Sequence, residues 1–271
     1  MRSLVLSLLI ASALGLSSYA QELRIEGSTT VGPIADAFAD HLKTLETNLK
    51  VTVNKTGSGN GAAALIDGRC DIAAMSRFMK PEEFKKAADK GVMPVAHLVA
   101  MDGICIIVHP SNPISRLTVS QVCDIYLGKI KNWRQIGGPD MPIVAISRDT
   151  SSGTYETFHE LVMKKQDMAS NIEYVNANPQ AHARVSTTPG AIAYVGLGFA
   201  DDKVKTVEID GIRPSRQTIA SGVYPLARPL FFFTNGFPQL GSMVYRFVTL
   251  YLTEKGQELI EAKGFVPVTN Y

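Results

Sequence analysis

The chain has 271 residues, and its 27 Lys and Arg nearly balance its 25 Asp and Glu, for a formal net charge of +2. Without a basic excess or a Lys/Arg cluster, the composition argues against nucleic acid as a partner. Apolar residues make up 45% of the chain, which supports a substantial core, and the length suits one large domain or two lobes of about 100 to 150 residues each.

The first twenty residues are typical of a cleavable secretion signal. Arg2 precedes an apolar stretch over residues 4–16, and residues 18–20 (Ser-Tyr-Ala) form a small-x-small cleavage site. The stretch is shorter than the roughly 18 to 20 apolar residues of a membrane span, and no later segment reaches that length. We therefore expect a soluble periplasmic protein that begins at Gln21, with an uncleaved anchor as the alternative.

Strand-like and helical segments alternate along the chain. In the first part, strands are expected over residues 23–26, 49–54 and 71–75, and helices over 33–45, 62–66 and 81–90. Extended segments follow at 95–99 and 103–108, then a helix at 119–126, a turn at 137–139, a strand at 142–147 and a helix at 155–165. The last part predicts a turn, a short helix and a strand within 189–198, a strand at 229–234 and helical spacing over 239–263. This order predicts an α/β fold with mainly parallel sheets and helices on both faces.

Three turns rich in Ser, Thr and Gly stand where a strand gives way to an amphipathic helix. They cover residues 27–30 (GSTT), 57–61 (GSGNG) and 151–154 (SSGT). A helix N-terminus presents unpaired backbone N–H groups and a partial positive charge, and hydroxyls add further donors. Ligands of open parallel sheets bind beyond the carboxyl ends of the strands, so we expect the turns to converge. They predict an anion site that needs no metal, although each turn alone is also typical of a simple helix N-cap.

Two arginines stand next to these segments. Arg148 precedes the third turn, and its guanidinium can hold an oxyanion through two parallel hydrogen bonds. Its alternative role is a salt bridge with Asp149 or another carboxylate. Arg77, directly after Ser76 at the end of the third expected strand, is the second candidate for contact with an anion.

The cysteines and histidines carry no catalytic or metal pattern. Cys70, Cys105 and Cys123 are an odd set without metal spacing, which permits one disulfide of undecided pairing, and Cys105 equally suits a small buried apolar residue. The five His lack metal spacing, and Ser58 and Ser152 lack the Gly of a nucleophile elbow. A dinucleotide-like GSGNGA run is weak evidence by itself. We therefore expect a binding protein rather than an enzyme, with no cofactor and no metal.

A family resemblance extends over nearly the whole chain after residue 20. It is carried, in this order and at these separations, by GSTTVGPIADAF, TGSGNG, DIAAMSR, DGICIIVHPSNP, IYLGKIKNWRQIGG, SRDTSSGTYETF, AIAYVGLGF and GFVPV. These segments resemble the substrate-binding proteins of bacterial ABC phosphate uptake systems. The resemblance implies a type II periplasmic binding protein, in which two α/β lobes are joined by two crossing strands and hold phosphate in the cleft between them.

The resemblance also implies boundaries, partners and contacts. Lobe I would cover residues 21–104 and 228–271, lobe II would cover residues 105–227, and the crossings would lie near 103–108 and 226–231. The closed form, a monomer, would dock on a membrane permease. By matching position, the phosphate contacts fall on Thr29, Thr30 through its backbone N–H, Ser58, Arg148, Ser152, Gly153 and Thr154, and the predicted site also includes Ser76, Arg77 and Asp102.

The sequence departs from the family at two places. In well-known members a carboxylate follows the Ser of the third-strand motif and accepts the proton of hydrogen phosphate, but this chain has Arg77 there. Asp102 occupies a place that those members fill with Gly, and we hypothesise that it has become the proton acceptor. Sulfate has no proton to donate, so such a carboxylate would reject it. Residues 149–151 (Asp-Thr-Ser) replace the usual acidic-Gly spacing before Ser152.

The fold alone does not decide the ligand, because lobed binding proteins share one architecture while their sites differ. A binder of another oxyanion such as sulfate, molybdate or a phosphonate, or a phosphate sensor or adhesion protein, is therefore the alternative. The arginines near the turns favour an anion over a cation.

Overall fold

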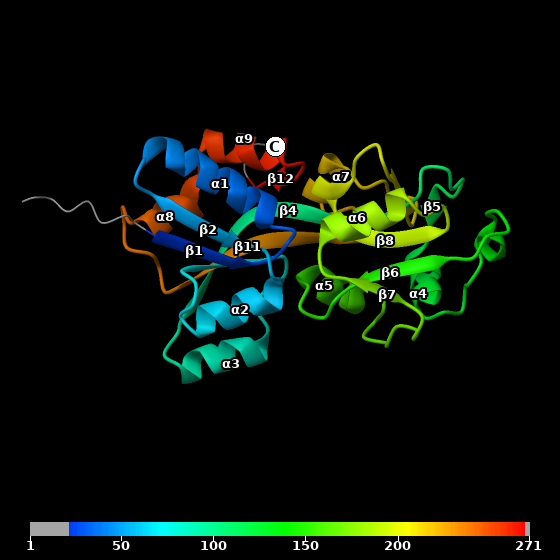
Figure 1. Ribbon diagram of the computed structural model, residues 1–271, viewed down its shortest axis with the longest axis horizontal. Coiled ribbons are helices and arrows are strands. Elements are labelled where there is room, and N and C mark those ends of the chain that lie inside the picture. The colour runs from blue at the N-terminus through cyan, green and yellow to red at the C-terminus, as the bar shows by residue number, and fades with distance from the viewer. Residues whose placement is uncertain (1–21, 269–271) are drawn as a thin grey trace, which may run out of the picture.

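The computed structural model describes residues 22–268, so the signal peptide predicted for residues 1–20 lies outside the described part of the chain. Two lobes lie side by side, and two long strands, β4 (Pro94–Val108) and β11 (Ala227–Asn235), run from one lobe into the other (Figure 1). Within residues 22–268, no helix combines the length and the apolar character that a membrane crossing needs.

The first lobe begins with three repeats of a strand followed by a helix. These are β1 (Glu22–Gly27), α1 (Gly32–Leu45), β2 (Lys50–Asn54), α2 (Ser58–Ile66), β3 (Ile72–Met75) and α3 (Pro81–Asp89). β1 lies between β2 and β3 and pairs with both in parallel. The end of the chain returns to this lobe as α8 (Met243–Thr249), η3 (Leu250–Leu252), α9 (Glu254–Ala262) and β12 (Val266–Pro267). All the elements expected over residues 22–90 are confirmed.

The second lobe is built around β6 (Val144–Arg148), which pairs in parallel with β7 (Glu173–Val175) and β8 (Ala191–Gly196). Its helices are α4 (Val119–Tyr126), α5 (Gly153–Leu161), α6 (Asn178–Ser186) and α7 (Arg216–Ala220). Short elements complete it: β5 (Arg116–Leu117), η1 (Trp133–Ile136), η2 (Leu197–Phe199), β9 (Lys205–Thr206) and β10 (Glu208–Ile209).

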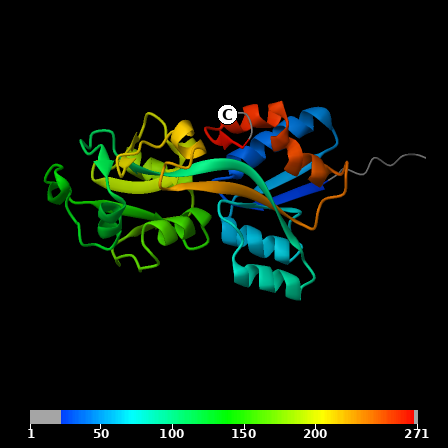
Figure 2. The ribbon, with the colours of Figure 1, turned by 180° about the vertical axis from the view of Figure 1, so that it is seen from behind.

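One continuous sheet path joins the lobes in the order β2-β1-β3-β11-β4-β8-β6-β7. β11 is antiparallel to β3 and to β4, and β4 is antiparallel to β8. Seen from behind, the two crossing strands run side by side from one lobe to the other (Figure 2). The expected parallel pairing therefore holds inside each lobe, and the antiparallel pairs belong to the crossing.

The crossing strands supply both cores. In β4, Ile104 and Ile106 enter one apolar cluster of the second lobe, while Cys105 and Ile107 enter the cluster on the opposite face. In β11, Phe232 lies in one cluster of the first lobe and Phe233 in another. Successive strand residues point to opposite faces, and burial of both faces explains the unbroken apolar runs in these segments.

Four expected elements differ from the structure in extent or order. Residues 95–99 and 103–108 form one strand, because the intervening residues also pair with β11. The helix expected over 155–165 ends at Leu161, and Lys164 and Lys165 adopt positive φ of 51° and 64°.

Within 189–198 the strand comes first and the short helix, η2, follows it, because the apolar run fills a sheet position between β4 and β6. Residues 239–263 form separate helices, since Thr253 caps α9 by accepting the Gly256 N–H at 3.0 Å.

The cysteines within residues 22–268 are all free, so the disulfide that the sequence permits is not formed there. Cys105 is fully buried in the second lobe, as expected for a small apolar residue. Cys70 is also buried, and burial raises the pKa of its thiol to about 12. Both thiols are therefore protonated packing groups at neutral pH.

The start of α2 is pressed against β1 through Gly61, which has no side chain. A Cβ at this position would lie 2.7 Å from the Glu26 carbonyl oxygen and 2.8 Å from the Gly27 Cα. Both neighbours are backbone atoms of a paired strand, so they cannot easily move. The absence of a side chain therefore lets the second turn approach the first.

We predict that Gly61→Ala lowers the free energy of unfolding by about 1–3 kcal/mol, because the close approach is lost, even though Ala normally favours a helix. Urea unfolding measures the change. Gly59→Ala in the same helix is the matched control, since its nearest atom outside the helix would be 3.5 Å away, and it should be neutral or slightly stabilising. Equal stabilities for the two variants would contradict this packing.

Candidate functional site

The three turns carry the N-termini of α1, α2 and α5, and in one of them a Ser side chain caps the helix. The Ser28 hydroxyl accepts the N–H groups of Thr30 and Val31 at 3.1 and 3.2 Å, and the Ser152 hydroxyl accepts that of Tyr155 at 3.2 Å. The capping role open to each turn is therefore confirmed for Ser152, whereas Ser28 bonds within the turn before α1, which has no side-chain cap. α2 begins without a side-chain cap, after Gly57 at a φ of 106°.

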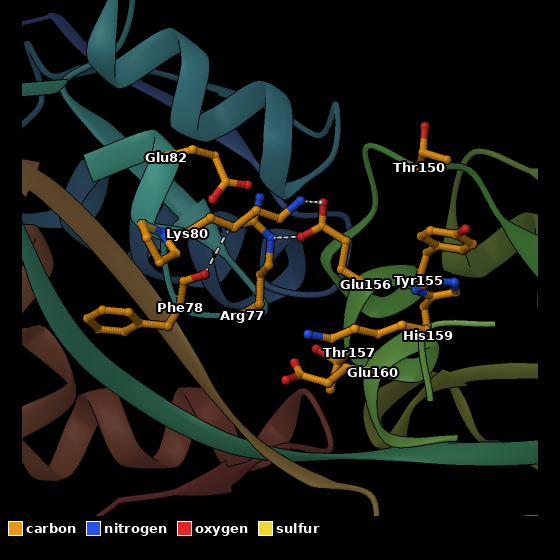
Figure 3. Close-up of a pocket in the computed structure, with 12 residues that line it drawn as sticks. Arg77, Phe78, Lys80, Glu82, Thr150, Tyr155, Glu156, Thr157, His159 and Glu160 are labelled. Atoms are coloured by element: carbon orange, nitrogen blue, oxygen red, sulfur yellow. Dashed lines mark hydrogen bonds and ion pairs between the residues drawn. The ribbon is translucent and has the colours of Figure 1, made fainter. Parts of the chain in front are cut away.

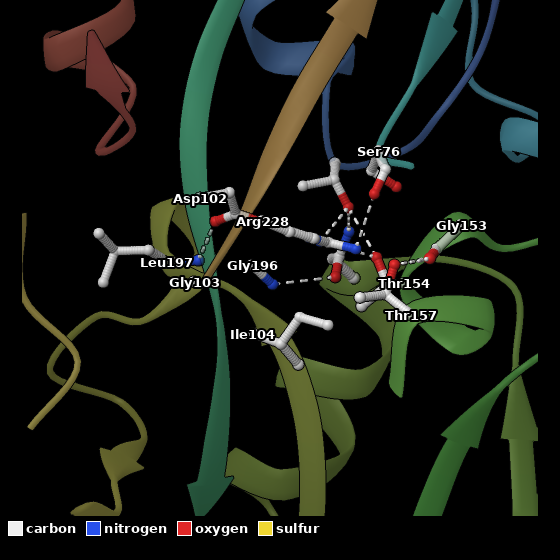
Figure 4. Close-up of polar contacts among 12 residues, drawn as sticks. Ser76, Asp102, Gly103, Ile104, Gly153, Thr154, Thr157, Gly196, Leu197 and Arg228 are labelled. Carbon is white, nitrogen blue, oxygen red and sulfur yellow. Dashed lines mark hydrogen bonds and ion pairs between the residues drawn. The ribbon is translucent and has the colours of Figure 1, made fainter. Parts of the chain in front are cut away.

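The turns meet across the boundary between the lobes, as the sequence predicts. The Thr30 and Thr154 hydroxyl oxygens lie 3.0 Å apart, although 124 residues separate them. A Cβ on Gly153 would lie 2.4 Å from the Ser58 hydroxyl oxygen, so these turns touch where the side chain is missing. Figure 4 shows Gly153 and Thr154 beside Ser76, which donates its N–H to the Ser58 hydroxyl at 3.0 Å.

Arg148 brings a buried positive charge to this cluster. Its side chain donates to the Thr29 hydroxyl at 3.1 Å and to the carbonyls of Asn176 and Val175 at 2.7 and 3.3 Å. Among residues 22–268 it has no carboxylate partner, so the alternative salt bridge with Asp149 is not formed. Burial lowers its pKa to about 10, which still leaves it charged at neutral pH.

One donor of Arg148 is unused. Its Nη1 is buried and has no hydrogen-bond partner in the part of the chain that the structure describes. A buried donor without a partner costs about 1–3 kcal/mol, and a buried unpaired charge costs more. The arrangement is therefore incomplete without an anion or another acceptor, and the guanidinium already joins the lobes through its bond to the Thr29 hydroxyl.

Arg77, the other candidate, is already neutralised. It donates to both oxygens of Glu83 at 2.7 and 2.8 Å and is ion-paired with Glu156. Lys80 reaches the second oxygen of Glu156 at 2.9 Å. These side chains line a groove of about 600 Å³ between α3 and α5, where Glu156 lies between the two cations (Figure 3). Arg77 therefore joins the lobes at the edge of the cluster instead of facing the threonines.

Asp102 is fully buried on β4 and is paired with Arg228 of β11. Arg228 donates Nε and Nη2 to the same Asp102 oxygen at 3.0 and 2.8 Å, and the Leu197 N–H donates to the other oxygen at 2.8 Å (Figure 4). Burial raises the pKa of Asp102, and the Arg228 charge acts against that shift. The role of Asp102 as proton acceptor stays a prediction, but its acceptor positions face Arg228 and Leu197.

The sequence analysis missed two residues of the cluster. Asn178, the first residue of α6, donates to the hydroxyls of Thr30 and Thr29 at 2.9 and 3.2 Å, and Arg228 donates to that of Thr154 at 3.0 Å. An Asn-Pro pair is typical of a helix start and could have revealed α6. Arg228 is a single charge in an apolar strand run, and a buried charge needs a partner.

The Arg77–Glu156 pair gives a test of the contact between the lobes. A double-mutant cycle with Arg77→Met and Glu156→Gln should give a coupling of about 1–3 kcal/mol in urea unfolding, because both side chains are largely buried. The control pair Arg134–Asp140 is 70% and 62% exposed and should couple by at most about 0.5 kcal/mol. A coupling near zero for Arg77 and Glu156 would mean that the pair does not form in solution.

Comparisons with known proteins agree with this architecture. The model of the PBP superfamily domain matches residues 15–254. The phosphate-binding protein PstS of Borreliella burgdorferi is 31% identical over 255 residues, which cover 90% of this chain and 89% of the relative. The phosphate-binding protein PstS of Staphylococcus epidermidis is 35% identical over 254 residues, covering 89% of this chain and 77% of the relative.

Solved structures show the same similarity. A Clostridium perfringens protein described as a phosphate ABC transporter substrate-binding protein, with bound phosphate, matches with a TM-score of 0.84 at 31% identity and covers 92% of this chain and 100% of its own. An ABC-type phosphate transport receptor from Vibrio cholerae gives a TM-score of 0.73 at 29% identity, with 90% and 99% covered. The expected type II periplasmic binding protein fold is confirmed. The chain therefore belongs to the PBP superfamily, within the family of the PstS proteins.

Proposed function

We propose that this chain is a periplasmic receptor that captures inorganic phosphate between its two lobes and delivers it to an ABC permease. The observation that carries the proposal is the buried Arg148 guanidinium, which within residues 22–268 has no carboxylate partner, leaves one nitrogen without an acceptor and bonds to the Thr29 hydroxyl across the boundary. Such a site lacks a negative charge, and a small oxoanion would supply it. Relatives and structural neighbours whose names specify phosphate support this ligand.

The contacts proposed for phosphate are donors. They are Thr29, the Thr30 N–H, Ser58, Arg148, Ser152, Gly153 and Thr154, with Ser76 holding Ser58 in place. The Thr30 N–H donates to the Ser28 hydroxyl at 3.1 Å in this structure and would have to be shared with the guest. The N-termini of α1, α2 and α5 add their partial positive charges, and three helix starts around one guest stabilise an anion without a metal. Within residues 22–268, no group of His, Cys, Asp or Glu is arranged to hold a metal ion.

Capture would require the lobes to open and close. We assign residues 21–104 and 228–271 to one lobe and 105–227 to the other, so that β4 and β11 form the hinge. The Thr30–Thr154 contact and the Arg77–Glu156 pair both span the boundary and would break on opening. The signal peptide over residues 1–20, the monomeric state and the docking of the closed form on permease subunits belong to the same proposal.

Sulfate remains the second candidate ligand because of one observation. The carboxylate expected to reject it, Asp102, is paired with Arg228 and is not bonded to the threonines of the site. A site made of donors alone binds a fully deprotonated oxoanion as readily as a protonated one. The competition between phosphate and sulfate therefore has to be measured.

We predict that protein stripped of bound phosphate by unfolding and refolding binds phosphate with a large thermal stabilisation. A ligand at a thousandfold excess over its dissociation constant adds about 4 kcal/mol of stability. Phosphate, sulfate, molybdate and an alkylphosphonate are compared in one panel by thermal shift and calorimetry. Stabilisation by sulfate or molybdate without a response to phosphate would overturn the proposal.

Arg148→Met should weaken phosphate binding by at least about a hundredfold, because it removes the charge and the unused donor together. Calorimetry on the refolded variant measures the loss. Arg134→Met is the matched control, since Arg134 is exposed and paired with Asp140 outside the site, and its affinity should be unchanged. An Arg148 variant that binds phosphate as tightly as the control would remove Arg148 from the site.

A further inference from the structure

Arg228 occupies the place where the two crossing strands meet the site. It lies on β11 directly opposite Asp102 on β4, and the two side chains are 3% and 0% exposed. Both strands pass from one lobe to the other at this level (Figure 2). The ion pair therefore fixes the Arg228 guanidinium where the crossing strands reach the boundary between the lobes, next to the turns of the site.

The free side of this guanidinium touches three segments of the site. Nη2 lies 3.0 Å from the Thr154 hydroxyl oxygen and 3.5 Å from that of Thr30, and Nη1 donates to the Ser76 carbonyl at 3.2 Å (Figure 4). Thr154 belongs to the second lobe, whereas Thr30 and Ser76 belong to the first. One buried side chain therefore contacts site residues of both lobes, and a purely local packing role would not require this.

These contacts decide what the hydroxyls can do. A hydroxyl has two acceptor lone pairs and one proton, whereas guanidinium and amide nitrogens only donate. Arg228 takes a lone pair of Thr154, and Asn178 takes one of Thr30, with the Asn178 amide held by the Gly196 N–H at 3.4 Å. The Thr30 hydroxyl accepts from Asn178 and also from Arg228 at 3.5 Å, so its own proton goes to Thr154. The proton of Thr154 then has no acceptor among residues 22–268. That proton is left to donate to a guest.

Asp102 stabilises the buried positive charge of Arg228. A second buried guanidinium beside Arg148 would be repelled by it, and a buried charge without a partner destabilises a fold by several kcal/mol. Asp102 compensates Arg228 and binds it through two nitrogens, and the Leu197 N–H fixes the carboxylate from behind. Of these two guanidinium groups, only that of Arg148 has no carboxylate partner within the described residues.

We infer that Arg228 is a positioning residue of the anion site: with Asp102 as its counter-ion, it acts through the Thr154 hydroxyl, which it holds as a donor toward the bound oxoanion. The inference rests on the proposed phosphate function and deepens it. It gives Asp102 the role of orienting Arg228, in place of accepting a phosphate proton.

The first test removes both charges, so that neither is left buried alone. Asp102→Leu/Arg228→Met should weaken phosphate binding in calorimetry by at least about tenfold, which is the loss expected for a bond to a charged donor. In a Thr154→Val background the same pair of changes should weaken phosphate binding by less than about threefold, because the hydroxyl through which Arg228 acts is gone. A merely structural pair would give equal losses in both backgrounds, and that result would overturn the inference.

Two further variants keep the test decisive if the double variant folds poorly. Arg228→Lys keeps a charge for Asp102 but cannot reach Thr154 and Ser76 together, so phosphate affinity should fall while urea unfolding changes little. Unchanged affinity would contradict the positioning role. Arg24→Met/Asp71→Asn is the matched control, because it removes another Arg–Asp pair in which Arg24 is bonded to Asp71, and it should leave binding unchanged.

Asp102→Asn separates the two roles of Asp102. If Asp102 acts only as the counter-ion of Arg228, this substitution should alter the affinities for phosphate and for sulfate by the same factor. The ratio of the two affinities then stays as in the wild type. A selective loss of phosphate preference would show that Asp102 is the proton acceptor and would overturn its assignment here.

The wild-type protein separates failure of this inference from failure of the proposed function. If it binds phosphate and the Asp102/Arg228 variant binds equally well, only the inference fails. If it binds sulfate or another oxoanion instead, the phosphate function fails, and the same comparisons with that anion decide the role of Arg228.

Discussion

The positive charge of Arg148 is the constraint to which the rest of the site responds. It is buried, it has no carboxylate partner among residues 22–268, and one of its donors is unused. It donates to the Thr29 hydroxyl and to the carbonyls of Val175 and Asn176, and the N-termini of α1, α2 and α5 add positive partial charge to the cluster. Such a buried charge is stabilised when an anion or another acceptor completes its hydrogen bonds.

The three buried arginines near the boundary differ in how their charges are balanced. Arg77 is paired with Glu83 and Glu156, and Arg228 is paired with Asp102. Each of these pairs fixes geometry: the first ties α5 to the start of α3, and the second ties β4 to β11. Arg148 alone of the three is left for a guest. A site with two compensated arginines and one uncompensated one can hold a small oxoanion without accumulating repulsive charge.

The crossing strands combine two tasks that usually fall to different elements. Their apolar side chains fill the cores of both lobes on both faces, and that packing makes the strands rigid beyond the crossing. At the crossing itself the same strands carry Asp102 and Arg228, which meet the turns of the site. The strands that join the lobes are therefore bonded directly to residues of the turns, through Arg228 to Thr154 and to the Ser76 carbonyl.

The repeated strand–turn–helix pattern and the three Ser/Thr/Gly turns follow from the sequence alone, because periodicity, capping and turn chemistry are local properties. The sequence also suffices to name Arg148 as a candidate contact for an anion. The family resemblance also marked Asp102 as unusual, because it stands where well-known members have Gly. Other contacts become visible only in the folded chain. They are the ion pairs Arg77–Glu156 and Asp102–Arg228, and the hydrogen bonds of Thr30 with Asn178 and Thr154. The partners in these contacts are separated by 79 to 148 residues, and no local pattern specifies which charges meet when two lobes of a chain are brought face to face.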